Sequence, residues 1–236
     1  MFSRSIALLG EKSMTLLQSK RVILFGIGGV GSWCAETLIR TGLIHLTIVD
    51  GDDVQPSNIN RQLPATQTTL GMPKVEALKK RLLEINPEAK IEAVHAMYEG
   101  QMDDAQRMAK GTIYDFSKYD YVIDAIDSVA DKTDLILCAT RTRGVKIFCS
   151  MGAALRFDPT QVTTGELMDI KGDALAKAVR ARMKQMNRKP SRKVRCVYST
   201  EQAQRCEARG SLMQVTAVFG CTLAALVIED IRKNRP

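Results

Sequence analysis

The sequence predicts an α/β fold: a doubly wound, Rossmann-like, mainly parallel sheet with additional strands in the C-terminal part of the chain. Three observations predict it. Short apolar runs alternate with amphipathic helical patterns, a glycine-rich turn follows the first of these runs, and acidic residues end the second run and the run near residue 124. Because the chain has 236 residues, 45% of them hydrophobic, it can bury one sizeable core, and we expect a single domain over 1–236.

The apolar periodicity predicts each element in order. We expect helices over 5–18, 30–41, 74–85, 103–109, 130–141 and 174–186, and strands over 21–26, 45–50, 91–94, 121–124, 146–150 and 194–198. After residue 158 the alternation loosens, and further strands should cross back over the sheet. The stretch 212–228 is nearly long and apolar enough to span a membrane, but four polar or glycine residues interrupt it. We therefore predict a buried core helix and no stable membrane insertion.

A glycine-rich turn marks the predicted ligand site. Gly26, Gly28 and Gly31 satisfy G-x-G-x-x-G between the first strand and the next helix, with Gly29 inside the motif. Glycines let the backbone approach a ligand closely, and a helix N-terminus offers free N–H groups and a positive dipole end, so the turn predicts a phosphate site. Asp50 ends the second strand and is expected to bind ribose hydroxyls, with a role as a turn cap as the alternative.

A polar cluster follows the second strand and contains Asp52, Asn58, Asn60, Arg61 and Lys74. Arg61 and Lys74 add two cations beside the glycine turn. A diphosphate bridge needs little of this charge, whereas a triphosphate has more charge to neutralise. For Asn58 and Asn60, ligand contact and a purely turn-forming role both stay open.

The run YDYVIDAID, from Tyr119 to Asp127, predicts a buried strand that ends in acidic residues. Ligands of open parallel sheets bind outside the carboxyl ends of the strands, so Asp124 and Asp127 should lie near the phosphates. Mg²⁺ binds through one or two carboxylates and phosphate oxygens, which makes these residues candidates for a magnesium site.

Taken in order, these motifs resemble the ThiF/MoeB-like adenylating superfamily of ubiquitin-activating and thiamine- and molybdopterin-biosynthesis enzymes. The motifs are G-x-G-G-V-G-S, D-x-D-x-V-x-x-S-N-x-N-R-Q, G-x-x-K-V-E and D-A-x-D. The resemblance implies that a substrate carboxylate attacks the α-phosphate of ATP. It implies ATP contacts from Asp52, Asn58, Arg61 and Lys74, Mg²⁺ on Asp127, and a structural role for Asp124.

The resemblance also implies a homodimer. In the superfamily an N-terminal arginine crosses from the partner subunit to the γ-phosphate, and Arg4 matches its position; a surface position for Arg4 is the alternative. Arg61, Lys74, Asp127 and Arg4 are thus the expected catalytic residues. The loop 156–158 is a candidate for a monovalent cation, Na⁺ or K⁺.

Four further segments resemble one branch of the superfamily, the tRNA threonylcarbamoyladenosine dehydratases. They are FSRSIALLGEK, SMGAALRFDPTQ, CVYSTE and GSLMQVTAVFG. The resemblance implies ATP-dependent cyclisation of a threonylcarbamoyl group on an adenosine beside the anticodon of tRNA, with loss of water. It divides the chain into a nucleotide-binding half over 1–150 and a substrate- and RNA-facing half over 151–236.

Two other functions stay open. One is adenylation of the C-terminus of a ubiquitin-like or sulfur-carrier protein, but the chain lacks the C-x-x-C pairs with which such relatives often hold zinc. The other is an NAD-dependent oxidoreductase, which would not need Arg61, Lys74 and Asp127. A sulfur- or redox-transfer protein is a further candidate as an interaction partner of this chain.

The net charge of +8 comes from one segment. Nine of the 34 Lys and Arg residues and no Asp or Glu lie in 174–200, which leaves 25 basic against 26 acidic residues elsewhere. This patch predicts RNA binding through Arg188, Lys189, Arg192 and Lys193, and a merely solvated basic face is the alternative.

The six cysteines show no C-x-x-C, which indicates reduced thiols in a cytoplasmic protein. Cys206 is the one candidate for a reactive thiol, although a structural role is favoured. We expect Cys34, Cys138, Cys149 and Cys221 to be core residues. Trp33 should also be core, and His45 and His95 should be structural residues without partners.

Overall fold

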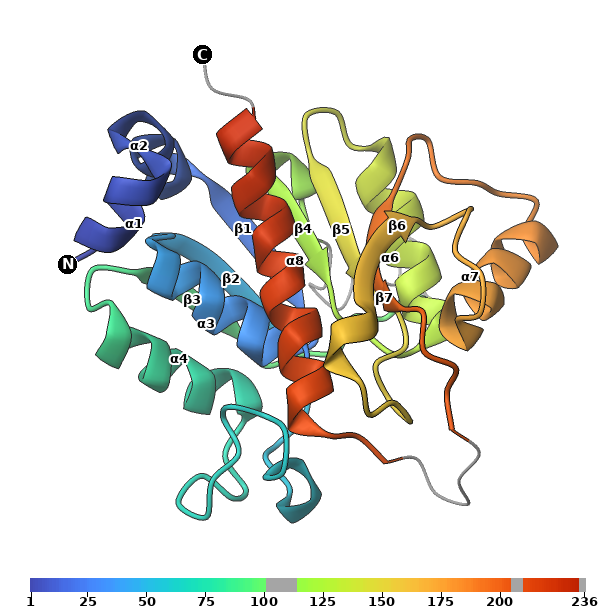
Figure 1. The fold of residues 1–236 in the computed structure, drawn as a ribbon, viewed down its shortest axis with the longest axis horizontal. Coiled ribbons are helices and arrows are strands. Elements are labelled where there is room, and N and C mark those ends of the chain that lie inside the picture. Colours follow the sequence, from blue (N-terminus) through green and yellow to red (C-terminus); the bar gives the residue numbers. More distant parts are fainter. Residues whose placement is uncertain (101–113, 205–209, 234–236) are drawn as a thin grey trace.

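The seven strands form one sheet in the order β3-β2-β1-β4-β5-β7-β6 (Figure 1). The computed structural model describes residues 1–100, 114–204 and 210–233. All strand pairs are parallel except β6 with β7. The strands are β1 (Arg21–Phe25), β2 (His45–Val49), β3 (Lys90–Val94), β4 (Tyr121–Asp124), β5 (Lys146–Ser150), β6 (Val162–Glu166) and β7 (Arg195–Ser199).

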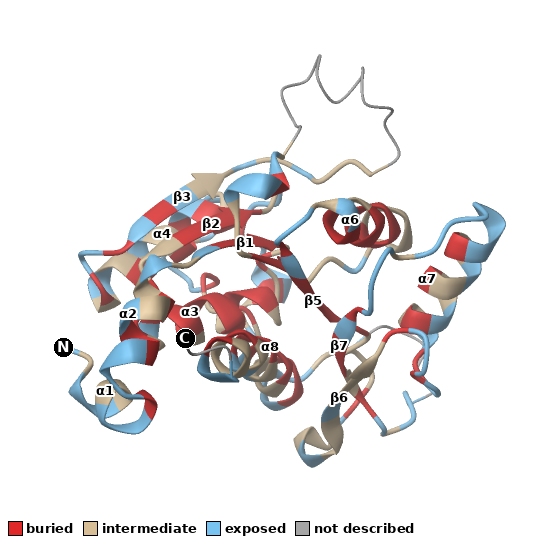
Figure 2. Ribbon diagram, turned by 90° about the horizontal axis from the view of Figure 1, so that it is seen from above, coloured by how far each residue is buried: buried red, intermediate tan, exposed pale blue. Residues whose placement is uncertain are grey.

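Helices cover both faces of the sheet (Figure 2). Apolar residues of α2, α3, α4 and α8 pack with Val22 and Leu24 on one face, and those of α6 and α7 pack with Ile23 and Phe25 on the other. This alternation along β1 is the period-two pattern of a strand buried on both sides. The helices are α1 (Ser3–Leu9), α2 (Glu11–Ser19), α3 (Gly31–Thr41), α4 (Lys74–Ile85), α6 (Val129–Arg141), α7 (Ala174–Gln185) and α8 (Met213–Lys233).

Most predicted elements are confirmed, including the doubly wound sheet and the additional C-terminal strands β6 and β7. The single helix expected over 5–18 is wrong. Gly10 has φ +80° and ends α1, so α1 and α2 are separate helices. Only glycine adopts this region without strain, and its non-helical backbone conformation separates the two helices. The helix expected over 103–109 lies outside the described residues.

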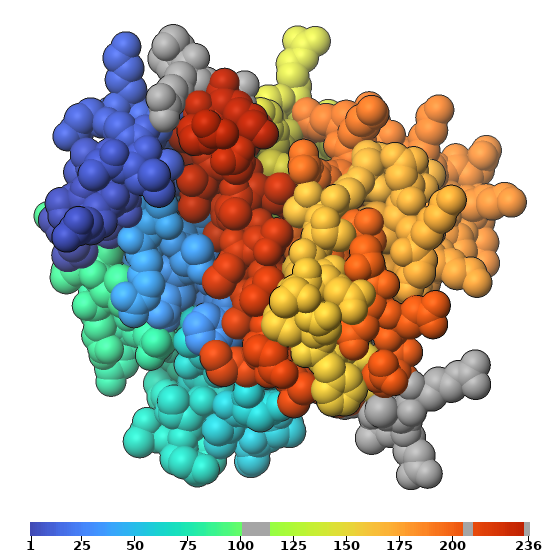
Figure 3. Space-filling model, viewed as in Figure 1, coloured from blue at the N-terminus to red at the C-terminus, as the bar shows by residue number. Residues whose placement is uncertain are grey.

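α8 is the core helix predicted from 212–228. By length and composition it could cross a membrane, but Val215, Phe219 and Leu223 are buried in the core cluster that α3 shares. Its other side lies at the molecular surface between the N-terminal helices and β6 (Figure 3). Cys221 is on that side and is exposed, so its prediction as a core residue is wrong. Apolar residues lie on all sides of α8, so its composition alone did not indicate which side is exposed.

The register of the sheet positions the ligand site. Phe25, the last residue of β1, is paired with Val49 of β2 and with Asp124 of β4. The loops that follow these three strands therefore start next to one another, at the same edge of the sheet. The order of the strands reverses between β1 and β4, and ligands of open α/β sheets bind at such a switch point.

Candidate functional site

A cleft of about 1190 Å³ opens at the carboxyl ends of the parallel strands. The loops after β1, β2, β3, β4 and β5 line it, together with the start of α7 and the segment before α8. Of the nucleotide contacts predicted within one chain, all except Gly31 line this cleft: Gly26, Gly28, Gly29, Asp50, Asp52, Asn58, Arg61, Lys74 and Asp127. The fold thus brings together residues that are up to 101 positions apart in the sequence.

Glycine serves a different purpose at Gly26, at Gly31 and at Gly28 in this turn. Gly26 has φ +87°, and a Cβ there would lie 2.7 Å from Ala125 O. A Cβ on Gly31 would lie 1.8 Å from Gly26 O, so only glycine fits at that position. The space beside Gly28 is open, because an added Cβ would have Gln62 Nε2, at 3.8 Å, as its only neighbour within 4 Å. The space in front of Gly28 is therefore available to a ligand that approaches the backbone.

The N-terminus of α3 faces this turn and has no side-chain cap. N–H groups at this helix end can donate hydrogen bonds to a phosphate, whose negative charge the helix dipole also favours. Asp50 stabilises the turn itself, because its carboxylate accepts hydrogen bonds from Ile27 N (2.5 Å) and Asp52 N (2.9 Å). The prediction that Asp50 binds ribose stays a prediction, and the turn-capping alternative describes these contacts.

Lys74 is buried at the first position of α4 and pairs with the half-exposed Asp52, with Nζ 2.6 Å from Oδ2. A lysine at a helix N-terminus is opposed by the helix dipole, so helix stability does not explain it. Burial of its ammonium beside the glycine turn instead suits an anionic ligand. The phosphate contact predicted for Lys74 therefore agrees with its position.

Arg61 is held from two directions. Its Nη1 donates to Ser57 O and Asn60 Oδ1, both at 2.9 Å, and its own carbonyl accepts from Trp33 Nε1 at 3.1 Å. Trp33 is only half-buried, so its prediction as a core residue is wrong: the indole N–H needs a polar partner, and that partner is the backbone of Arg61. Asn58 is buried in a short 3₁₀ turn, where its Oδ1 accepts from Gln55 N.

Asp127 lies in the loop between β4 and α6 and is exposed to the cleft. In the described part of the chain its carboxylate makes no hydrogen bond or ion pair. Those ranges also contain no group of three His, Cys, Asp or Glu residues that could hold a metal ion. Mg²⁺ at Asp127 would therefore rely on phosphate oxygens and water for its other ligands, as Mg²⁺ commonly does. Asp124 is fully buried against Lys132, which confirms its structural role.

The opposite wall of the cleft contains a buried ion pair that sequence reasoning missed. Arg156 Nη2 lies 3.0 Å from Asp173 Oδ2, and both side chains are almost completely buried. The guanidinium also donates to Gly152 O, Ser199 O and Glu201 O, while Asp173 caps α7 through Ala176 N. The aspartate directly before the helical pattern at 174 is a signal for an N-cap, but no feature of the sequence indicates Arg156 as its partner.

Several predicted residues lie outside the cleft. Arg4 is exposed on α1 and does not line the cleft of its own chain. Arg188, Lys189 and Lys193 are exposed beyond the C-terminal end of α7. Arg192 is exposed as well, and its Nη2 donates to Ala139 O (2.9 Å) and Thr142 O (2.6 Å) at the end of α6, so its contact with RNA stays a prediction. Cys206 lies outside the described residues.

His95 was expected to lack partners, and this is wrong. Its Nε2 lies 3.0 Å from Gly51 O and 3.5 Å from Asp53 Oδ1, because the loop after β3 returns beside the loop after β2. A loop contact of this kind cannot be deduced from the strand pattern alone.

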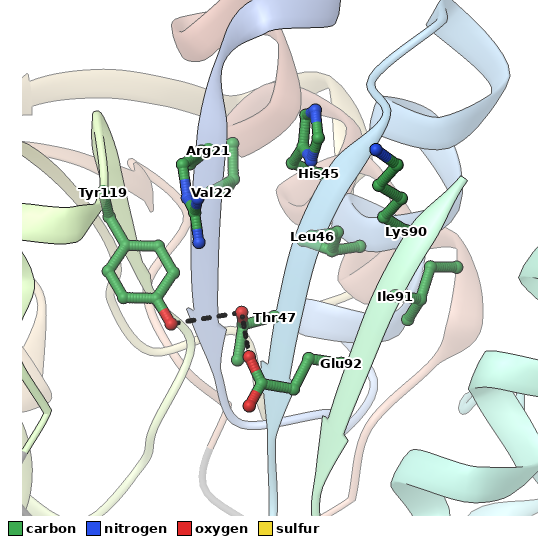
Figure 4. A pocket seen from close by; sticks show the side chains of 9 residues that line it. All are labelled: Arg21, Val22, His45, Leu46, Thr47, Lys90, Ile91, Glu92 and Tyr119. Carbon is green, nitrogen blue, oxygen red and sulfur yellow. Dashed lines mark hydrogen bonds between the residues drawn. The ribbon is translucent and has the colours of Figure 1, made fainter. Parts of the chain in front are cut away.

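A second cavity, of about 450 Å³, lies toward the amino ends of β1, β2 and β3 (Figure 4). Arg21, His45 and Lys90 are register neighbours there, and Thr47 links Glu92 to Tyr119 by hydrogen bonds. Burial and the nearby Lys90 and Arg21 lower the pKa of His45. None of the predicted site residues lines this cavity.

The fold and the cleft define a class of protein. A glycine turn at the switch point, an uncapped helix end, two cations and a free carboxylate have the chemistry that binding of a nucleoside polyphosphate requires. The model of the ThiF family matches residues 2–235, and the chain belongs to that family.

Two curated relatives illustrate the range of similarity. The chain is 38% identical to the Escherichia coli tRNA threonylcarbamoyladenosine dehydratase over 85% of this chain and 73% of that protein. It is 33% identical to the Escherichia coli molybdopterin-synthase adenylyltransferase, over 60% of this chain and 52% of that protein. Among solved structures, the Escherichia coli dehydratase in complex with ATP superposes with a TM-score of 0.85 at 34% identity, covering 98% of this chain and 93% of that one.

Proposed function

We propose that this chain is an ATP-dependent tRNA threonylcarbamoyladenosine dehydratase. One observation carries the proposal: the cleft gathers the open glycine turn, Arg61, Lys74 and the free carboxylate of Asp127 around one space. Similarity to the Escherichia coli dehydratase, whose structure was solved with ATP, extends over almost the whole chain. The similarity to the molybdopterin-synthase adenylyltransferase covers less of both chains.

The proposed reaction has two steps. A carboxylate oxygen of the threonylcarbamoyl group attacks the α-phosphorus of ATP in line, and pyrophosphate leaves. A nitrogen or oxygen of the same modification then attacks the activated carbonyl carbon, closes a ring and releases AMP, so the substrate loses the elements of water. The substrate carboxylate is ionised at neutral pH, so the first step needs no general base.

The residues of the cleft act by position and charge. The backbone at Gly28 and the N-terminus of α3 hold phosphate oxygens, while Arg61 and Lys74 stabilise the negative charge that develops on them. Asp127 would hold Mg²⁺, which neutralises phosphate charge when it is bound. Asp50 orients the ribose, and Asp52 and Asn58 shape the wall beside Lys74.

The proposal extends to the assembly. Because Arg4 lies outside the cleft of its own chain, we propose that it completes the site of a partner subunit in a homodimer. A cytoplasmic location, a monovalent cation in the loop 156–158 and a sulfur- or redox-transfer partner are further proposals that follow from the family resemblance. Membrane insertion is not expected, since α8 packs in the core.

Pyrophosphate release separates the candidate functions. We expect release with tRNA that carries threonylcarbamoyladenosine and none with unmodified tRNA or without tRNA. Release that depends instead on the C-terminus of a sulfur-carrier protein would favour the adenylyltransferase function. Preferential binding of NAD over ATP in calorimetry would contradict both.

The basic segment 188–193 is the proposed tRNA surface, and its position supports contact with a large substrate. α7 starts at Ala174, which lines the cleft, and has 12 residues, so this segment lies about 18 Å from the cleft along the helix axis. A tRNA that places one nucleotide in the cleft extends well beyond that distance.

Replacing Arg188, Lys189 and Lys193 by Ser should weaken tRNA binding and flatten its dependence on log salt. Each lost phosphate contact should reduce the slope by about 0.7–0.9, whereas ATP affinity should not change. The control of equal charge removes three cations from α2 and α4, namely Lys12, Lys79 and Lys80. Equal slopes for the two triple variants would mean that this segment is only a solvated face.

A further inference from the structure

A buried ion pair lies directly beneath the loop that carries Asp127. Lys132 Nζ lies 2.7 Å from Asp124 Oδ2, and neither side chain is exposed. Asp124 ends β4, and Lys132 stands in the first turn of α6. The pair therefore joins the two elements that flank the loop 125–128, and the proposed reaction makes no direct use of it.

The two charges depend on each other. Burial raises the pKa of Asp124 above its ordinary value, and Lys132, the Ile126 N–H and the Cys149 thiol offset this only in part by stabilising the carboxylate. The Ile126 N–H donates to Asp124 Oδ1 at 3.1 Å. Within the described ranges, Lys132 Nζ and Asp124 Oδ2 have no other hydrogen-bond partner. Each would be an uncompensated buried charge without the other.

Stability of the fold does not account for such a pair. Replacing a buried ion pair by well-packed apolar residues is often neutral or stabilising, because both charges lose their hydration when they are buried. An ion pair does, however, fix the distance and direction between the two groups that form it. Here those groups belong to the two ends of the loop that carries Asp127.

The same loop is also fixed against the glycine turn. Ile126, whose N–H is held by Asp124, directly precedes Asp127. Ala125 N donates to Phe25 O at 2.9 Å, and Ala125 O lies where a side chain on Gly26 would be. A shift of the Asp124–Lys132 pair would therefore move Asp127 relative to the phosphate-binding backbone.

We propose that Asp124 and Lys132 are positioning residues for Asp127, and that their buried pair holds the loop 125–128 so that the Asp127 carboxylate faces the phosphate-binding turn. The inference rests on the proposed function, because it requires Asp127 to bind a divalent cation together with ATP. Neither residue touches the reacting groups.

The test is Mn²⁺ binding in the presence of ATP, measured by electron paramagnetic resonance, which requires no turnover. D124L/K132M should fold with an unchanged or higher melting temperature, yet bind Mn²⁺ about 10- to 100-fold more weakly, the scale for losing an outer-sphere support of a metal ligand. D124N/K132M keeps an amide oxygen for the Ile126 N–H and should recover part of that affinity.

The control is E36Q/R81Q, which removes another ion pair, between the buried Glu36 of α3 and the partly exposed Arg81 of α4, away from the cleft. Its Mn²⁺ affinity should equal that of the wild type. Normal Mn²⁺ affinity in D124L/K132M would overturn the positioning role, and so would failure of both double variants to fold, since the pair would then serve the fold itself. A wild-type protein that binds no Mn²⁺ with ATP would overturn the proposed function and this role together.

Discussion

The two walls of the cleft are built in opposite ways. On the wall formed by the loops after β1 and β4, the backbone at Gly28 is open and Asp127 is exposed without a partner in the described part of the chain. On the wall formed by the loop after β5 and the start of α7, Arg156 and Asp173 are buried and use their polar groups on each other and on the backbone.

This difference distinguishes polar groups that are free to bind a ligand from polar groups that hold the protein structure in place. Polar groups that the protein leaves unsatisfied next to a cleft are available to a ligand, whereas a satisfied buried network fixes the shape of a wall. We therefore expect changes on the first wall to affect binding and catalysis, and changes on the second wall to affect stability first. Three substitutions on the walls test this, and a fourth outside both walls serves as a contrast; they are given in order of decreasing effect.

Asp173→Ala should lower the free energy of unfolding by about 3–5 kcal/mol, because it leaves the Arg156 guanidinium buried without its carboxylate. It also removes the N-cap of α7. Chemical denaturation measures the loss, and Asp169→Ala, an exposed aspartate nearby, should change stability by less than about 0.5 kcal/mol. Similar stability of the two variants would show that the second wall is not held by this pair.

Asp127→Ala should reduce turnover by roughly 10²-fold or more, the scale for removing a key electrostatic group. Its melting temperature should stay close to that of the wild type, because the carboxylate is exposed. Pyrophosphate release and thermal unfolding measure the two effects. Near-normal turnover would mean that a different carboxylate holds the metal.

Gly28→Ala should leave the fold intact but weaken ATP binding by about 1–3 kcal/mol, since the new methyl group fills the space that a phosphate would enter. Calorimetry measures this affinity. Gly31→Ala is the matched contrast, because its Cβ would lie 1.8 Å from Gly26 O and should destabilise the fold. If Gly28→Ala bound ATP normally, the phosphates would not lie against this part of the turn.

Glu36→Gln tests a largely buried charge outside both walls. Burial raises the pKa of Glu36, but hydrogen bonds from Arg81 and Arg40 lower it more, so it lies below the ordinary value. A depressed carboxyl pKa stabilises the protein above the unfolded-state pKa, and this contribution is lost as pH falls through the folded-state pKa.

The Glu36→Gln variant should thus be less stable by about 1 kcal/mol at pH 7, a modest value because Arg81 is partly exposed. The difference from the wild type should shrink below about pH 4. Urea denaturation across pH measures it, and a difference independent of pH would mean that charge plays no part. Catalysis should be unaffected at neutral pH.

Much of the nucleotide wall could be predicted from the sequence because its signals are local. The glycine turn and Asp50 each follow a strand directly, and acidic residues stand at the end of β4. Parallel strands bring their carboxyl ends to one edge of the sheet. The break at Gly10 was missed because glycine is also tolerated within a helical pattern. Trp33 and His95 were misjudged because each makes a contact with a segment distant in the sequence or with a loop that no pattern predicts.

By itself, the sequence determined the alternation of strands and helices, the phosphate-binding turn, the cations beside it and the concentration of basic charge in 174–200. These are properties of short segments, in which periodicity, backbone freedom and charge act locally. Only the tertiary structure decided which polar groups are engaged: Asp124 with Lys132, Arg156 with Asp173, and Asp127 with no partner in the described ranges. Such pairing depends on the register of the strands and on how helices pack on them, so it is a property of the folded chain as a whole.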